Sequence, residues 1–124
     1  MKKSAAVIFA VLLVIIGTPV ACAHTVLIGS TPINGSKLQI LPTKIILKFA
    51  DPLLTIGKRA INRIVVTDPM NKVVTVGKDL VRGAVLTHSI VDATPINGVY
   101  RVSYRVSAQD GHVVTGAFSF TLQR

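Results

Sequence analysis

Two histidines and an aspartate are the residues of this chain best suited to chemistry. His24 follows Ala21-Cys22-Ala23, an A-x-A motif that closes a segment with a positive start and an apolar run of about a dozen residues. This pattern is typical of a signal peptide, so we expect residues 1–23 to be removed and His24 to become the first residue. An N-terminal histidine offers a metal ion an amine and an imidazole together.

Two other interpretations of this start remain open. The apolar run Ala5–Ile16 is shorter than the about 20 residues that a membrane-spanning helix needs, which disfavours an uncleaved anchor. Acylation of Cys22 would produce a lipoprotein, but the preceding Pro19-Val20-Ala21 matches a lipid-attachment pattern poorly. That processing would also leave His24 without a free amine.

The second chemical feature is the segment Gln109-Asp110-Gly111-His112. Asp110 and His112 are two residues apart, so in an extended segment their side chains project to the same side. Taken alone, Asp-Gly is a common turn signal and a nearby histidine is usually a surface residue. Together with His24, however, the set comprises an amine, two imidazoles and a carboxylate, which suits tetragonal Cu(II). The sequence therefore predicts a Cu(II) site of His24, Asp110 and His112.

The elements that must position these residues are expected to be β-strands. Apolar residues alternate most clearly over Tyr100–Val106, and alternation also directs Ile45, Leu47 and Phe49 inward. No segment shows a helical stripe. Six or seven short strands in about 100 residues favour an all-β Greek-key β-sandwich or a small barrel. The other expected strands are Thr25–Ile28, Ile64–Thr67, Lys72–Val76, Ala84–Val91 and a last strand that buries Phe118, Phe120 and Leu122.

Turn signals separate these runs. Thr-Pro-Ile-Asn-Gly occurs at Thr31–Gly35 and again at Thr94–Gly98, but the flanking residues differ, so we interpret both copies as turns and not as a duplication. Asp68-Pro69-Met70-Asn71 is expected to form a hairpin turn. Residues 24–124 are therefore expected to form one domain.

Composition narrows the function classes. The chain has 14 lysines and arginines; two of them, Lys2 and Lys3, lie in the expected signal peptide, and the remaining 12 against five aspartates give residues 24–124 a net charge of +7. Basic residues are scattered and lack interleaved aromatics, so no nucleic-acid partner is expected. Attraction to anionic lipids or to an acidic membrane partner is consistent with the charge. The only cysteine, Cys22, leaves with the signal peptide, so no disulfide is expected.

The sequence resembles the CopC family of periplasmic copper-resistance proteins over essentially all of residues 24–124. The resemblance implies a cupredoxin-like or immunoglobulin-like β-sandwich of about seven strands that holds Cu(II) near one end. The matching stretches are Ala23-His24, Ser30-Thr31-Pro32 with Asn34-Gly35, Pro42, Leu47 to Pro52, Gly98 to Val102, Tyr104 to His112, and Gly116 to Phe120.

The resemblance also assigns roles to individual residues. It makes His24 a bidentate ligand through its amine and ring, His112 the second imidazole and Asp110 the carboxylate ligand. Asp51 stands near a position where the family often has a glutamate, so it is a further candidate ligand; the alternative is an acidic turn residue before Pro52. A Cu(I) site is not expected, because one thioether, that of Met70, cannot form a soft-ligand site.

Three functions are compared. The first, which the resemblance favours, is a periplasmic, non-enzymatic Cu(II)-binding protein of copper homeostasis or resistance, which buffers copper or delivers it to an inner-membrane transporter of the CopD type. The second is a copper monooxygenase with an N-terminal histidine, disfavoured by the small domain and the lack of tryptophan. The third is an adhesive β-sandwich without metal. His88, the remaining histidine, is interpreted as an ordinary polar strand residue.

Overall fold

Alternating apolar residues form eight β-strands in the computed structural model, which describes residues 25–124. The expected signal peptide, residues 1–23, and His24 lie outside the described residues. No helix occurs among the described residues, and thus none there is long and apolar enough to cross a membrane. The strands are β1 (Leu27–Thr31), β2 (Lys37–Leu38), β3 (Lys44–Phe49), β4 (Arg63–Thr67), β5 (Thr75–Arg82), β6 (Val85–Ile90), β7 (Gly98–Ser107) and β8 (Val113–Leu122).

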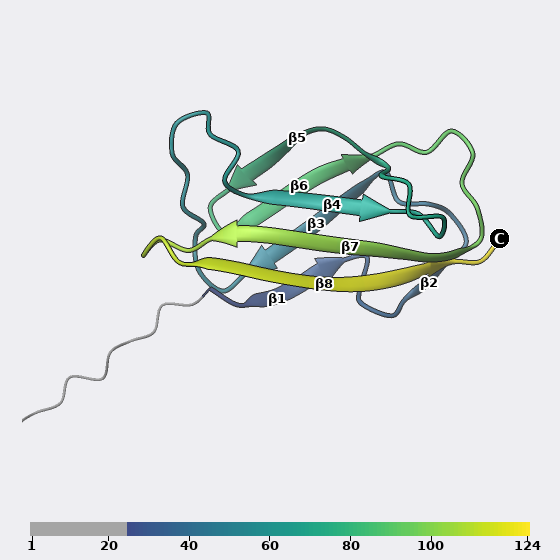
Figure 1. Ribbon diagram of the computed structural model, residues 1–124. Coiled ribbons are helices and arrows are strands. Elements are labelled where there is room, and N and C mark those ends of the chain that lie inside the picture. Colours follow the sequence, from purple (N-terminus) through teal and green to yellow (C-terminus); the bar gives the residue numbers. More distant parts are fainter. Residues whose placement is uncertain (1–24) are drawn as a thin grey trace, which may run out of the picture.

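The strands form two four-stranded sheets that face each other (Figure 1). One sheet has the order β1-β3-β6-β5 and is antiparallel throughout; we call it sheet A. The other, sheet B, has the order β2-β8-β7-β4, in which the short β2 pairs parallel to β8. The edge strands β4 and β5 come from different sheets and lie near each other. The all-β sandwich expected from the sequence is confirmed.

Inward side chains from both sheets build one core. Ile45, Leu47 and Phe49 of β3 are at most 1% exposed, as the alternation predicted. Phe118, Phe120 and Leu122 of β8 are also buried, which confirms the expected inner face of the last strand. Alternate residues of β7 are buried, as the sequence pattern predicted, and they include Tyr100, Val102 and Val106.

Two sequence expectations about strands need correction. The described residues form eight strands instead of about seven, because β2 has only two residues and no apolar alternation to mark it. The strand expected at Lys72–Val76 instead spans Thr75–Arg82. Its pairing with β6 is shifted between Val76 and Leu80, beside Gly77 at φ 81°. This bulge breaks the period of two, so the strand was not recognisable as a single alternating run.

The tyrosine hydroxyl at the start of β7 holds the preceding loop against the core. Tyr100 is fully buried and its ring stacks on Phe120 with centroids 5.3 Å apart. Its hydroxyl accepts a hydrogen bond from the backbone N–H of Ile96 and donates to the Ile96 carbonyl oxygen, both at 3.2 Å. A tyrosine bonded to backbone a few residues upstream is a feature of immunoglobulin-like sandwiches.

The segment 68–71 forms a turn, as the sequence predicted, but the strands that flank it, β4 and β5, belong to different sheets and do not form a regular hairpin. Asp68 accepts the backbone N–H groups of Met70 and Lys72 through Oδ1, each at 2.8 Å. The flanking residues Thr67 and Val73 make a single antiparallel bridge, after which the chain passes from β4 in sheet B to β5 in sheet A. The turn is therefore a crossing between the sheets.

Candidate metal site

The turn between β7 and β8 carries the acid and the imidazole that the sequence singled out. Ala108 donates its backbone N–H to the carbonyl of His112 at 2.8 Å, and Gly111 donates to the carbonyl of Ala108 at 2.9 Å. Gly111 has φ of 86°, a left-handed conformation that glycine adopts without strain. These bonds fold residues 108–112 into a tight turn at one end of the sandwich (Figure 1).

Asp110 and His112 contact each other directly. The Asp110 Oδ1 atom accepts the backbone N–H of His112 at 2.9 Å, and its Oδ2 atom lies 2.7 Å from the ring Nδ1 of His112. The imidazole is 66% exposed and the carboxylate 32%. A carboxylate bonded to one ring nitrogen fixes the orientation of an imidazole that binds a metal through the other nitrogen. The predicted proximity of these two side chains is confirmed.

The described chain begins at the same end of the sandwich. Thr25 is 1% exposed, and its hydroxyl bonds to the backbone carbonyl of Asp51 at 3.3 Å and to the Asp51 N–H at 3.4 Å. The neighbouring residues also bond to each other: Ala50 donates its backbone N–H to the carbonyl of Val26 at 2.8 Å. The start of β1, the end of β3 and the β7–β8 turn therefore share one end of the molecule (Figure 1).

Residues just after β3 hold the β7–β8 turn in place. Leu53 forms an antiparallel bridge with Ala108, and the side-chain amide of Gln109 donates to the Leu53 carbonyl at 3.0 Å. Asn62, which is 4% exposed, accepts the backbone N–H of Ser107 at 2.8 Å. The turn is thus anchored on its β7 side by a segment that begins two residues after Asp51.

The described residues supply two of the predicted ligands as a close pair. Among residues 25–124, no group of three or more His, Cys, Asp or Glu side chains is close enough to hold a metal ion. Asp51 is exposed, and its role as a ligand stays a prediction. A nitrogen-rich site at this end therefore depends on His24, which directly precedes the anchored Thr25.

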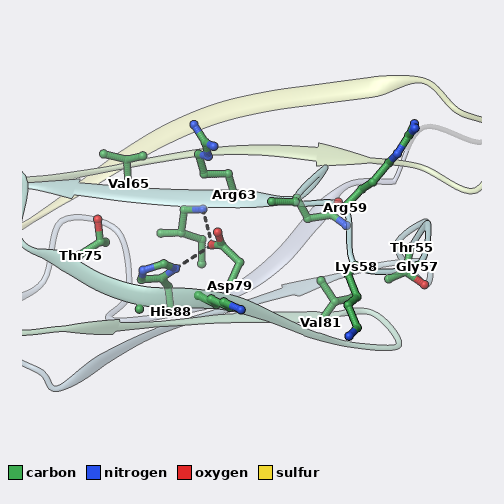
Figure 2. A pocket seen from close by; sticks show the side chains of 15 residues that line it. Thr55, Gly57, Lys58, Arg59, Arg63, Val65, Thr75, Asp79, Val81 and His88 are labelled. Atoms are coloured by element: carbon green, nitrogen blue, oxygen red, sulfur yellow. Dashed lines mark hydrogen bonds and ion pairs between the residues drawn. The ribbon is translucent and has the colours of Figure 1, made fainter.

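A second polar cluster, which the sequence interpretation missed, lies at the edge formed by β4 and β5. Asp79 Oδ1 lies 2.8 Å from the ring Nδ1 of His88 and also accepts the backbone N–H of Ile64 at 2.8 Å (Figure 2). His88 is a strand residue, as expected, but it is only 6% exposed. The pair lies in a groove of about 580 Å³ whose lining includes Lys58, Arg59, Arg63 and Lys78.

Comparison with known proteins agrees with this architecture. A family model described as the CopC domain matches residues 27–123. The crystal structure of CopC from Methylosinus trichosporium OB3b is similar, with 25% identity and a TM-score of 0.68 over 81% of this chain and 94% of that one. PcoC, a methionine-rich copper resistance protein from Escherichia coli, matches with 25% identity and a TM-score of 0.64, covering 82% of this chain and 100% of that one. No curated protein matches the sequence.

These similarities define the class as a β-sandwich copper resistance protein. The chain belongs to the CopC family. Proteins of this family are periplasmic, bind copper and are generally not enzymes. The resemblance stated from the sequence is therefore confirmed.

Proposed function

We propose that this chain is a periplasmic Cu(II)-binding protein whose site is completed by its own processed N-terminus. In this proposal a signal peptide, residues 1–23, is cleaved after Ala23, and residues 24–124 form the copper-binding domain. His24 binds Cu(II) through its amine and ring, His112 through its ring, and Asp110 supplies the carboxylate. The copper so held is buffered or delivered to an inner-membrane transporter of the CopD type.

The observation that carries the proposal is the Asp110–His112 pair at the end where the described chain begins. The 2.7 Å contact from Asp110 Oδ2 to the ring Nδ1 brings a carboxylate and an imidazole side by side, so both donors are available to one ion at this end. The Thr25 hydroxyl fixes the first described residue to the backbone of Asp51. His24 directly precedes Thr25 in the sequence, and this supports assigning it to the same metal site as the pair.

The donor set favours Cu(II) over other divalent ions. Cu(II) has the highest affinity of the first-row divalent series and accepts square-planar nitrogen and oxygen donors. Zn(II) prefers tetrahedral sites. A terminal amine, two imidazoles and one carboxylate supply three nitrogens and one oxygen, which is the composition of a tetragonal Cu(II) site. Asp51 is proposed as an additional, weaker carboxylate near the ion.

Electron paramagnetic resonance of bound Cu(II) tests the proposal. The protein beginning at His24 is compared with the same protein acetylated at its α-amine, which preserves every side chain but removes the amine as a metal donor. We expect nitrogen hyperfine structure from three nitrogens only in the first, and from at most two in the second. Identical spectra from both versions, or an N-terminus other than His24 in the exported protein, would contradict the proposal.

Single substitutions separate the ligands. Loss of a group that only orients a metal ligand typically lowers metal affinity by about 10–100-fold. Because His112 is a proposed ligand, His112→Ala is expected to lower Cu(II) affinity by more than that. Asp110→Asn preserves shape but removes the charge of a proposed ligand, so it is also expected to weaken Cu(II) binding by more than about 100-fold, the upper limit for a group that only orients a ligand. His88→Gln is the control, because His88 contacts Asp79 in a separate cluster and its loss should leave Cu(II) affinity unchanged.

A further inference from the structure

The outer face of sheet B carries arginines without acidic neighbours. Arg63 of β4 and Arg105 of β7 are direct cross-strand partners, and both are exposed. Arg101, four residues before Arg105, projects to the same side of β7. We call the outward surface of β4 and β7 around these three arginines the arginine face.

No acidic side chain in the described part of the chain neutralises this face. The five aspartates occupy the loop after β3, the 68–72 turn, the bulge of β5, the loop before β7 and the β7–β8 turn. Both ion pairs found among residues 25–124 join an aspartate to a histidine, so no arginine there has a carboxylate partner. Like charges directly opposite each other on a sheet destabilise it. The Arg63–Arg105 pairing thus places two like charges side by side on an exposed surface.

The surroundings of the arginine face add positive charge. Arg59, in the loop before β4, extends to the same side as Arg63 and away from the buried Asp79–His88 pair (Figure 2). The register places Thr67 and Ser119 beside Arg101, and Thr115 beside Arg105. These hydroxyl side chains are short, so the guanidinium groups project beyond them.

The chemistry of the face favours phosphate. A guanidinium group donates two parallel hydrogen bonds to a phosphate, and several arginines on one sheet favour a partner that presents many phosphates in a plane. Protein interfaces usually depend on central aromatic anchors. The aromatic residues of the described chain, Phe49, Tyr100, Tyr104, Phe118 and Phe120, belong to the core or pack against it. We propose that the arginine face docks the protein on an anionic phospholipid bilayer.

This inference is independent of copper binding, because the arginine face contains none of the proposed ligands. It does have a consequence for copper transfer. The strand β7 runs from the arginine face to the turn that carries Asp110 and His112. A protein lying with sheet B on the bilayer would therefore hold that turn beside the membrane surface.

Vesicle sedimentation of the full-length mature protein tests the docking. Vesicles of phosphatidylcholine and phosphatidylglycerol in equal amounts are compared with pure phosphatidylcholine vesicles. Because each basic side chain near an anionic surface raises partitioning about 5-fold, Arg63→Gln, Arg101→Gln and Arg105→Gln together are expected to lower it about 100-fold. Binding of the unchanged protein should weaken when salt rises from about 0.1 M to about 0.5 M.

A matched triple variant on sheet A separates the face from net charge. Lys44→Gln, Lys48→Gln and Arg82→Gln remove the same charge from exposed strand positions. Sheet A lies about 10 Å behind sheet B, and these side chains project outward from its far face, so they lie more than one Debye length, about 10 Å at 0.1 M salt, from the lipid charges. This variant should therefore stay within about 5-fold of the unchanged protein. Thermal unfolding checks that both variants are folded.

Three results would overturn the proposal. The first is absence of binding to the mixed vesicles, and the second is an equal loss of binding in both triple variants. The third is capture of the unchanged protein by a glutamate-rich peptide without binding to vesicles, which would assign the arginine face to an acidic protein partner.

Discussion

The carboxylate of Asp79 lies 2.8 Å from the imidazole Nδ1 of His88, and the pair is buried where β4 and β5 approach each other. The same carboxylate oxygen accepts the N–H of Ile64 on the edge strand of sheet B. Asp79 and His88 both belong to sheet A. One oxygen atom therefore joins the two sheets and satisfies a backbone donor that the edge of β4 leaves without a strand partner.

Replacement of Asp79 tests this connection between the sheets. Asp79→Ala leaves the Ile64 N–H and the His88 ring without their acceptor, so we expect a loss of about 2–4 kcal/mol in the free energy of unfolding. Asp79→Asn retains an oxygen acceptor and should lose less than half of that amount. Chemical denaturation of both variants measures the difference. An unchanged denaturation midpoint for Asp79→Ala would show that the contact contributes nothing to stability.

The two tyrosines of β7 provide a matched comparison. Tyr100→Phe retains the ring stacked on Phe120 but removes the hydroxyl that bonds to both backbone groups of Ile96. We expect it to lower the free energy of unfolding by about 1–2 kcal/mol. Tyr104 packs edge-on against Phe49, and its hydroxyl makes no hydrogen bond within residues 25–124. Tyr104→Phe should therefore change stability by less than about 0.5 kcal/mol. Equal effects of the two substitutions would contradict this assignment.

Stability is expected to decrease at alkaline pH because both tyrosines resist ionisation. Burial has the largest effect and raises the pKa of Tyr100; the backbone hydrogen bond to Ile96 lowers it by less, and the charges of Asp92 and Asp68 raise it again. Burial also raises the pKa of Tyr104. Since the folded protein holds these protons more tightly than the unfolded chain, the stabilisation is complete below about pH 10 and is lost as pH rises through the folded pKa.

An ultraviolet titration of tyrosinate measures this effect directly. The midpoint for the native protein should lie above that of the protein unfolded in denaturant. Other groups also titrate in this range, so the control is the unfolding of a variant with phenylalanine at both Tyr100 and Tyr104. If that variant loses stability with pH as steeply as the unchanged protein, the tyrosines are not responsible.

Local patterns accounted for much of the fold and for one part of the candidate site. Strands β3, β7 and β8 were predictable because each buries one face and exposes the other, so apolar residues recur every second position. The Asp110–His112 contact was predictable because it joins residues two positions apart in one turn.

Contacts that depend on register were not predictable in the same way. The Asp79–His88 pair requires the bulge at Gly77, which shifts the pairing of β5 with β6 and directs a polar strand residue inward. The Arg63–Arg105 pairing requires knowing that β4 lies beside β7, although these two residues are 42 positions apart in the chain. Neither relation leaves a signal in the local sequence.

The anchoring of the β7–β8 turn leads to a prediction that rests on the proposed copper site. Gln109 donates its side-chain amide to the carbonyl of Leu53 at 3.0 Å, directly before Asp110. Gln109→Ala removes this bond but no proposed ligand, and the Leu53–Ala108 bridge remains. Loss of a group that orients a ligand typically lowers metal affinity by about 10–100-fold. Since the backbone anchor persists, we expect Cu(II) binding to weaken by only about 10-fold.

Gln123→Ala is the control, since Gln123 follows β8 at the opposite end of that strand. A competition titration of the protein beginning at His24 compares them, and equal Cu(II) affinities would show that the side chain of Gln109 does not position the turn.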